Sequence, residues 1–237
     1  MGSRTFVTAS AHEVRAATAA WASFGTAHTN VAICTVTALP GAAVSHGIVN
    51  TYSATSTRHC YLRLNGDVGP GTLSLKVGST VMNPSTNMIP ATDGRWYLMG
   101  ATKAAGTVAV DFFMYDYSTG TWTEFASAGT VANRTAAAIA PCLGAINGGT
   151  SITGKIAAGM LLNRALLKAE WRTLINGRWS WYAALGRAAG GSVNRECLID
   201  LTDLGRLYDR AGGENTGNLI SAGTQPVVDA GKSPPGW

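Results

Sequence analysis

Short runs of β-branched and apolar residues, each closed by a turn signal, recur along most of this 237-residue chain. About ten of these runs have the length of a β-strand. One segment alone combines the spacing of a helix with a clear stop signal. A sheet with an apolar face must bury that face against another layer. The pattern therefore predicts an all-β fold in which two sheets pack as a sandwich.

The predicted strands are distributed over the first two thirds of the sequence. Their ranges are 4–9, 30–39, 44–52, 58–64, 72–77, 94–103, 107–117, 122–126, 139–146 and 154–162. Residues 78–94 contain two prolines and many polar side chains, and they are predicted to form a long loop. Residues 12–24 carry apolar side chains at helical spacing but have poor cap signals, so their structure is left open.

The segment 154–176 predicts a buried strand that runs into a short helix. The apolar run from 155 to 162 is bounded by Gly154 and Asn163. Apolar residues then recur at roughly helical spacing, at Leu166, Ala169, Leu174 and Ile175. Gly177 supplies the stop, because glycine accepts the left-handed conformation that closes a helix. The next segment, 178–186, is predicted to be a second short helix or an aromatic latch.

Residues 107–117 alternate, which assigns their side chains to two faces of a strand. One face carries Val108, Val110, Phe112 and Met114. The other carries Asp111, Phe113 and Tyr115. The turn at 117–122 then leads into the strand 122–126, so the two strands are predicted to form a hairpin.

Two local patterns resemble one known family. The strand, the Asn-Arg-Ala-Leu turn at 163–166 and the helix with Ala-Glu at 169–170 resemble the closing element of LamG-like, concanavalin A-like jelly rolls. The Gly-x-Trp-Tyr strand at 94–97 and the Gly-x-Trp hairpin at 120–122 also resemble these domains. The resemblance implies one jelly-roll domain over 1–237, with a latch or interface extension at 178–237.

The resemblance also implies a setting, because such domains are common in virion proteins of tailed bacteriophages. We therefore expect a non-enzymatic structural protein of the virion, assembled in the host cytoplasm. It would be a capsid decoration protein, a minor capsid protein or a minor tail protein. Its expected partners are major capsid or tail proteins and further copies of itself. The alternative is a carbohydrate-binding module that attaches the particle to a host-surface glycan.

Composition excludes several other classes of protein. Charged residues make up 13% of the chain, about half the roughly 25% of ordinary soluble domains. The net charge of +5 is scattered without a basic run, so direct nucleic-acid binding is not expected. No apolar run reaches the length of a membrane span, so no membrane association is expected. The four cysteines are predicted to be buried thiols at Cys34, Cys60, Cys142 and Cys197.

The sequence offers few groups for chemistry. Sandwich-type glycoside hydrolases need two carboxylates close together, whereas Asp111 and Asp116 fall on opposite faces of their strand. No catalytic set is therefore expected. The richest acidic group, at Asp200, Asp203 and Asp209, is either a solvated loop or a calcium site. No other cofactor is predicted.

Aromatic residues are the remaining candidates for contact. Trp96, Tyr97, Tyr115, Tyr117 and Trp122 gather around the predicted hairpin. Their spacing fits packing within a sheet or a protein interface. It also fits a stacking surface for a glycan.

Overall fold

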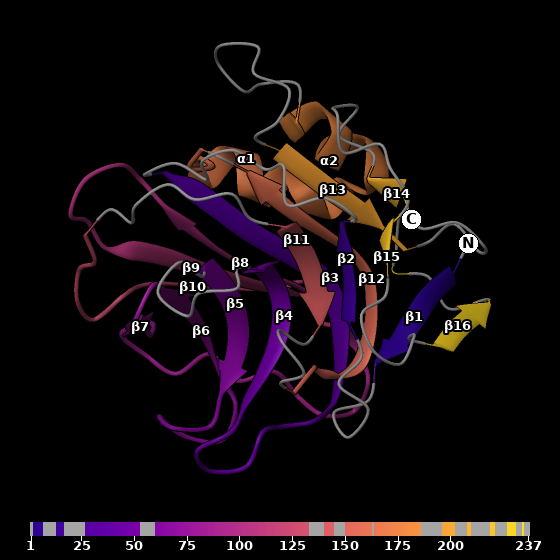
Figure 1. Ribbon diagram of the computed structural model, residues 1–237, viewed down its shortest axis with the longest axis horizontal. Helices are drawn as coiled ribbons and strands as arrows, with labels where there is room; N and C mark the ends of the chain where they lie inside the picture. The colour runs from indigo at the N-terminus through magenta and orange to yellow at the C-terminus, as the bar shows by residue number, and fades with distance from the viewer. Residues whose placement is uncertain are drawn as a thin grey trace.

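The computed structural model describes residues 2–6, 13–16, 27–52, 60–132, 140–144, 150–162, 164–185, 196–201, 208–209, 219–220, 227–230 and 234. In this part of the chain, two antiparallel sheets lie one against the other, and short helices cover part of one sheet (Figure 1). The predicted all-β jelly-roll sandwich is confirmed.

The larger sheet carries the hairpin that the sequence singled out. Its strand order is β10 (Thr121–Ala126), β9 (Val110–Asp116), β8 (Trp96–Lys103), β3 (His28–Ala38), β12 (Thr153–Leu162), β1 (Gly2–Phe6) and β16 (Val227–Ala230). Two further strands extend it from β12, namely β13 (Glu196–Asp200) and β14 (Tyr208–Asp209). Strand β10 lies at one edge of this order.

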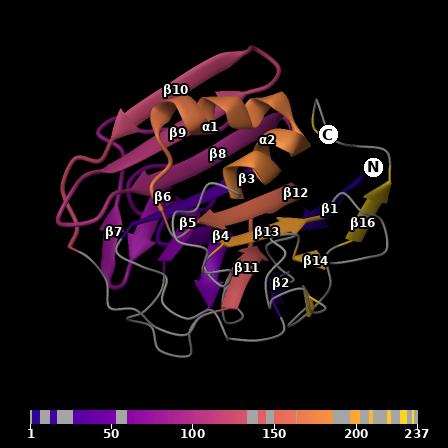
Figure 2. The same ribbon diagram turned by 90° about the horizontal axis from the view of Figure 1, so that it is seen from above.

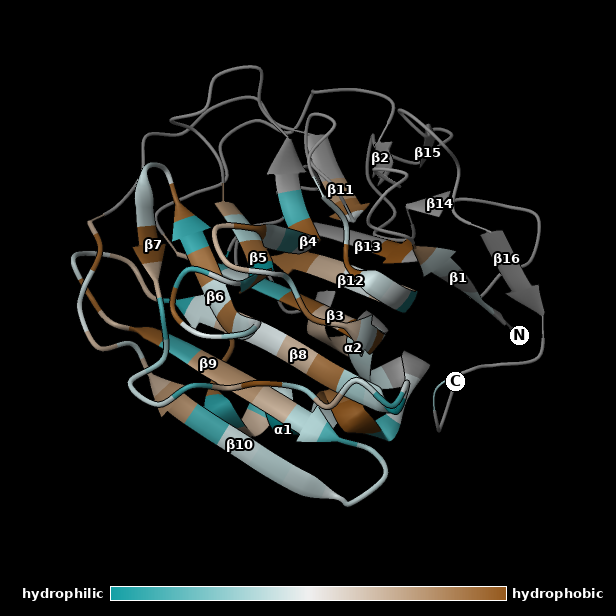
Figure 3. Cartoon of the chain, turned by 90° about the horizontal axis from the view of Figure 1, so that it is seen from below, coloured by the Kyte–Doolittle hydropathy of each residue, from teal (hydrophilic) through white to brown (hydrophobic). Residues whose placement is uncertain are grey.

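The smaller sheet covers the other side of the core. Its strand order is β15 (Leu219–Ile220), β2 (Glu13–Ala16), β11 (Ala140–Gly144), β4 (Ser45–Tyr52), β5 (Cys60–Asn65), β6 (Thr72–Val77) and β7 (Thr80–Met82). Bands of apolar and polar residues alternate along β5 and β6 in Figure 3. The apolar side chains of both strands face the core, and the polar side chains that alternate with them, among them Arg63 and Ser74, are buried as well.

The main core fills the space between the two sheets. On β9, the side chains of Val110, Phe112 and Met114 point into it, and Leu62 and Leu75 reach it from the smaller sheet. The alternate residues of β9 belong to a second apolar cluster on the outer face of the larger sheet. The two faces predicted for residues 110–115 are therefore confirmed.

Three short helices close the second cluster. They are α1 (Lys168–Thr173), the 3-10 helix η3 (Leu174–Asn176) and α2 (Arg178–Leu185). Figure 2 shows α1 and α2 over the larger sheet. Trp171, Leu174 and Trp181 pack from the helices against residues of that sheet. The predicted helix after the 154–162 strand is confirmed, and residues 178–185 form a second short helix. The latch or interface role of 178–237 stays a prediction.

Other local expectations had different outcomes. The predicted loop 78–94 contains the short strand β7, which extends the smaller sheet by pairing with β6. In the open segment 12–24, residues 13–16 form β2, and the others lie outside the described residues. Cys34, Cys60 and Cys142 are buried thiols, as predicted. The side chain of Cys197 lies outside the described residues.

Candidate contact surface and adjoining cleft

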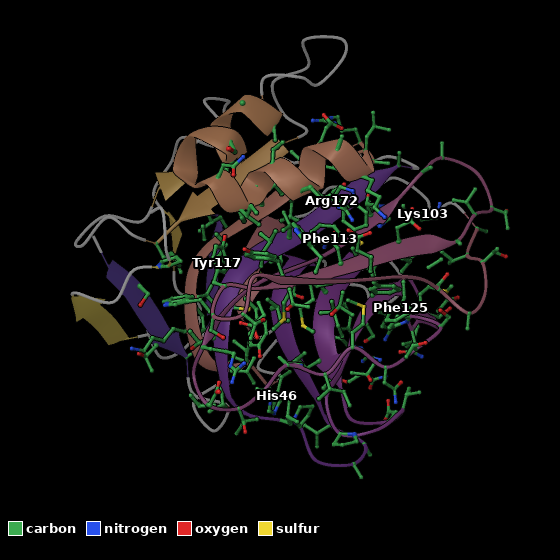
Figure 4. All side chains as sticks on the ribbon, turned by 180° about the vertical axis from the view of Figure 1, so that it is seen from behind. His46, Lys103, Phe113, Tyr117, Phe125 and Arg172 are labelled. Carbon is green, nitrogen blue, oxygen red and sulfur yellow. The ribbon has the colours of Figure 1, made fainter. Side chains whose placement is uncertain are left out.

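Four of the predicted aromatic residues form one surface, here called the aromatic patch: Trp96, Tyr115, Tyr117 and Trp122. They come from β8, β9, β10 and the turn after β9, and all four are half-buried at the margin of the outer cluster. The rings of Tyr115 and Trp122 have centroids 5.0 Å apart, and those of Tyr115 and Tyr117 lie 5.1 Å apart at 84°. Figure 4 labels Tyr117 among them.

Strand register explains why these rings meet. Trp122 lies directly opposite Tyr115 in the antiparallel pair of β10 and β9. The amide of Tyr117 donates to the carbonyl oxygen of Trp96 at 3.1 Å, which places those two residues side by side. Directly opposed aromatic residues stabilise a strand pair beyond the area that they bury. The patch is therefore a rigid part of the sheet.

Tyr97 does not belong to the patch. Its side chain is buried in the core between the sheets, where its hydroxyl accepts a hydrogen bond from the amide of Ala91 at 2.9 Å. Neighbouring strand residues face opposite sides, so Trp96 and Tyr97 cannot share one surface. The expectation that Tyr97 offers a stacking face is wrong.

A charged network fixes one end of the patch. Asp116 accepts from Arg95 at 2.9 Å and from the hydroxyl of Ser118 at 2.6 Å. Burial alone would raise the pKa of Asp116. The hydrogen bonds that its carboxylate accepts outweigh this effect and lower the pKa to about 2. Arg95 also pairs with Asp93. The turn between β9 and β10 is thus held by its own polar side chains.

A cleft of about 250 Å³ opens at the other end, between the β9–β10 hairpin and helix α1. We call it the α1 cleft. Its walls include Asp111, Glu124, Phe125, Leu166, Lys168 and Trp171. Glu124 lies two residues beyond Trp122 on β10, so both side chains face the same side of the strand. The patch and the cleft are therefore continuous.

Glu124 joins α1 to the edge strand. Its carboxylate pairs with Lys168 and accepts from Arg172 at 2.7 Å. Figure 4 shows Arg172 on the helix above this hairpin. Burial raises the pKa of Glu124, but the hydrogen bonds from the two cations lower it more, so its pKa lies below the usual value. The carboxylate is held charged in this position.

Asp111 has the opposite electrostatic character. It lies opposite Ala126 in the strand pair and on the same face as Glu124. Partial burial raises the pKa of Asp111, and the nearby Lys168 lowers it by less. Two carboxylates with pKa shifts of opposite sign thus lie on one side of the hairpin.

Trp171 forms the floor between the patch and the helix. It is 4% exposed and packs edge-on against Phe113, with ring centroids 4.1 Å apart. Its indole nitrogen is buried and has no hydrogen-bond partner among the described residues. Phe113 in turn lies over Gly100, where a Cβ atom would come within 2.3 Å of the ring. Glycine on β8 thus makes room for the aromatic stack.

Sequence reasoning identified the patch and missed the cleft. The sequence pairing of interest was Asp111 with Asp116, but Asp111 lies near Lys168 and Asp116 pairs with Arg95. Glu124, the carboxylate that shares a face with Asp111, had no sequence signal of its own. A usable signal was present, because Lys168 and Arg172 lie four residues apart on one side of a helix. That spacing predicts a common acidic partner but does not identify it.

The predicted calcium group is only partly described. Asp200 and Asp209 lie on the paired strands β13 and β14, but their side chains and the whole of Asp203 lie outside the described residues. Within the described residues, no group of three or more His, Cys, Asp or Glu side chains is arranged to hold a metal ion. The calcium site stays a prediction. Similarly, none of the described helices has the length and apolarity to cross a membrane.

Comparison with known proteins defines the class of fold. Neither a protein-family model nor a curated protein sequence matches the chain. Among solved structures, the heptameric SAP-like pentraxin of Limulus polyphemus is similar at a TM-score of 0.50 and 13% identity, covering 96% of this chain and 94% of that one. Tailspike protein 2 of the Escherichia coli O157:H7 bacteriophage CAB120 gives 0.47 and 16%, covering 70% and 23%. The CBM40 module of the Ruminococcus gnavus IT-sialidase, bound to α2,3-sialyllactose, gives 0.45 and 11%, covering 62% and 80%.

The pentraxin comparison and the two antiparallel sheets define a jelly-roll β-sandwich. This likeness extends over nearly the whole of both chains. At 13% identity it shows the fold, and any activity has to be argued from this chain's own residues.

Acid is expected to lower the free energy of unfolding. Asp116 and Glu124 have folded-state pKa values below their ordinary values of 3.8 and 4.5. Their charged forms therefore stabilise the fold, and this stabilisation is fully present above the ordinary values. It is lost as the pH falls through the folded-state values, which is about 2 for Asp116. Urea unfolding measured at intervals between neutral pH and about pH 2 would follow this loss.

The matched variant for this measurement is Asp111→Asn, because the pKa of Asp111 is shifted up rather than down. The raised pKa of Asp111 means that its charged form is disfavoured in the folded protein. Removing the charge is therefore expected to increase stability at neutral pH. Equal acid sensitivity in Glu124→Gln and the unaltered protein would contradict the role given to Glu124.

Proposed function

We propose that this chain is a non-enzymatic structural protein of a tailed-phage virion. It attaches to another virion subunit through the aromatic patch and the adjoining edge of β10. The observation that carries the proposal is that four half-buried rings from neighbouring strands are gathered on one outward-facing surface. Aromatic side chains are enriched in protein interfaces, where few residues supply most of the affinity.

The edge of the larger sheet supports a protein partner. Within the described residues, β10 pairs with β9 alone, so the other edge of residues 121–125 carries no strand. An unpaired strand edge is a template for addition of a strand from another chain. Because the patch and this edge belong to the same strand, one partner can engage both.

The composition of the chain agrees with such a role. Charged residues account for only 13% of the sequence, so the surface resists association less than that of an ordinary soluble domain. The sequence resemblance to LamG-like domains of tailed phages supplies the setting. The expected partners are major capsid or tail proteins and other copies of the chain, and the mechanism is adhesion without turnover.

Loss of one ring is expected to weaken attachment. In Trp122→Ala, the affinity for particles is expected to fall by about 30-fold, the effect of removing an interface residue worth about 2 kcal/mol. Co-sedimentation of the purified chain with phage particles that lack it measures this change. The fold should survive, because Trp122 is only half-buried at the sheet edge.

Ile89→Ala is the matched control for attachment. Ile89 is 38% exposed and belongs to neither the aromatic patch nor β10, so its removal is expected to leave attachment unchanged. Equal co-sedimentation of Trp122→Ala and the unaltered chain would show that the aromatic patch is not part of the attachment interface. Failure of the unaltered chain to sediment with any particle would refute the proposed function itself.

A second candidate is a carbohydrate-binding module for a host-surface glycan. The favouring observation is the tilted pair of Tyr115 and Trp122, whose ring faces meet at 46° next to the polar turn 117–121. Flat rings stack on the apolar faces of sugars while hydroxyl groups bind their edges. Glycan-array binding that disappears in Trp122→Ala would support this candidate, and uniform absence of binding would exclude it.

A further inference from the structure

Strand β10 is an edge strand without the usual protection. Figure 3 shows it as the outermost strand of its hairpin, and among the described strands it pairs with β9 alone. The strands at the other ends of the two described sheet orders are shorter: β7 has three residues, β15 two and β16 four. Edges are usually blunted by short length, by proline, by lysine or by a bulge. Strand β10 has none of these features, because it makes a regular run of pairs with β9 from Thr121 to Ala126.

The hydrogen-bond pattern identifies the backbone groups that point outward from β10. In an antiparallel pair, alternate residues turn both of their backbone groups toward the partner strand. The amide of Ser127 donates to the carbonyl oxygen of Val110 at 2.7 Å, so residues 121, 123 and 125 also face β9. The N–H and C=O groups of Trp122 and Glu124 therefore point away from β9. They have no hydrogen-bond partner among the described residues.

The loop residues 83–85 occupy one end of this outward side. Ser85 donates its amide hydrogen to the carbonyl oxygen of Ala126 at 2.8 Å. The amide of Ala128 donates to the carbonyl oxygen of Asn83 at 3.2 Å. Backbone pairing on this side of β10 is thus already in place next to the open stretch. What stays open is 121–125, and a further strand has to fit that length.

A second copy of the same strand matches this open stretch. Antiparallel pairing of 121–125 with 121–125 of another copy is centred on Thr123, and it places Trp122 opposite Glu124 of the second copy. Each such pair exchanges two backbone hydrogen bonds. The outward groups of Trp122 and Glu124 are then all satisfied in both copies. A two-fold contact of this kind closes on itself, so no open stretch of β10 is left.

The side chains on the outer face are complementary in this register. Glu124 pairs with Lys168 and accepts from Arg172 at 2.7 Å, so two cations lie beside its carboxylate. Trp122 of the second copy would lie next to these cations, and a cation near an indole ring is stabilising. Because Glu124 is already neutralised, the two copies oppose no like charges across the strand pair.

We propose that β10 pairs with β10 of a second copy about a two-fold axis beside Thr123. The larger sheets of the two copies then form one continuous sheet. This inference rests on the proposed attachment function, and it names the subunit that takes the edge of β10. The rings of Trp96, Tyr115 and Tyr117 lie outside that edge and stay available to the particle.

Sedimentation velocity of the purified full chain tests the dimer. We expect reversible dimers with a Kd on the order of 10 μM, because one short strand pair makes a small interface. The measurement covers concentrations from well below this Kd to well above it. A chain that stays monomeric throughout would overturn the proposal. Assemblies that keep growing with concentration would also overturn it, because a two-fold contact ends at the dimer.

Proline at position 124 removes one outward donor and spares the pairing with β9. Proline is tolerated in an edge strand where the N–H group faces solvent. Glu124→Ala is the matched control, because it loses the same carboxylate and keeps the N–H group. Each dimer of Glu124→Pro loses two backbone hydrogen bonds, so its Kd is expected to lie about 30-fold above that of Glu124→Ala. Equal dimerisation of the two variants would show that this edge is not the contact.

The variants Trp122→Pro and Trp122→Ala repeat the comparison at the other outward residue if circular dichroism shows that Glu124→Pro does not fold. Co-sedimentation with phage particles separates this proposal from the attachment function. Dimers that bind no particle would contradict only the attachment function. A monomeric chain that binds particles, and loses this binding in Glu124→Pro but not in Glu124→Ala, would contradict only the second copy. A strand of another virion protein would then be the occupant of the edge.

Discussion

Replacing Gly154 with alanine is expected to lower the free energy of unfolding by about 3 kcal/mol. Gly154 is the second residue of β12 and lies at an irregularity in the pairing with β3, and its φ is +156°. A Cβ atom there would lie 2.0 Å from the carbonyl oxygen of Thr35. Because the obstruction is backbone in the centre of the sheet, no side-chain rotation relieves it. Urea unfolding followed by far-ultraviolet circular dichroism measures the loss.

Gly129→Ala is the control for this substitution. A Cβ atom at Gly129 would meet nothing within 4 Å, so the change should alter stability by less than about 0.5 kcal/mol. If Gly154→Ala were as stable as Gly129→Ala, the close approach of β12 and β3 would be wrong. The register that carries the rest of the larger sheet would then need revision.

Truncation of Trp181 is expected to have a similarly large effect, about 4 kcal/mol for Trp181→Ala. Trp181 is fully buried in the outer cluster. Its indole nitrogen donates to the carbonyl oxygen of Leu174 at 3.0 Å, which joins α2 to η3. Alanine would leave a cavity and an unpaired carbonyl oxygen beneath the helices. Denaturant unfolding measures the loss of stability.

Trp181→Phe separates the two contributions, because it retains most of the ring and removes the hydrogen bond. We expect it to cost about half as much as alanine. Ala183→Ser changes an exposed position of the same helix and should have little effect. An unfolding midpoint for Trp181→Ala close to that of Ala183→Ser would show that the helices do not depend on this contact.

The helix layer matters to the candidate site because it supplies one wall of the cleft. Lys168, Trp171 and Arg172 all belong to α1, which connects directly to η3. The patch, in contrast, is built on strands and turn residues alone. Trp181→Ala is therefore expected to disturb the α1 cleft more than the aromatic patch. The cleft and the patch thus respond differently to one change in the core.

Much of the sandwich could be read from local sequence pattern. Residues 110–115 alternate between core and outer face because successive side chains of a strand point to opposite sides. The strand 153–162 and the helix after it follow from an apolar run, helical spacing and Gly177, whose φ is +95°. These features depend on neighbouring residues, so the sequence contains them directly.

Features that depend on distant partners were harder to predict. Strand β7 has only three residues, and its pairing with β6 decides its structure more than its own propensity does. Local pattern left two options for 178–186, and the packing of Trp181 in the outer cluster stabilises the helix. Local pattern gives weak evidence wherever tertiary packing supplies most of the stability.

The amino-acid sequence determined the two-sheet body and the aromatic character of the hairpin, because alternation and turn signals act over a few residues. Only the tertiary structure decided that Glu124 would meet Arg172, 48 residues away, and that Asp111 and Trp171 would line one cleft. Such meetings depend on how α1 packs across β9 and β10. That packing is the sum of many weak contacts between segments, and no local pattern encodes it.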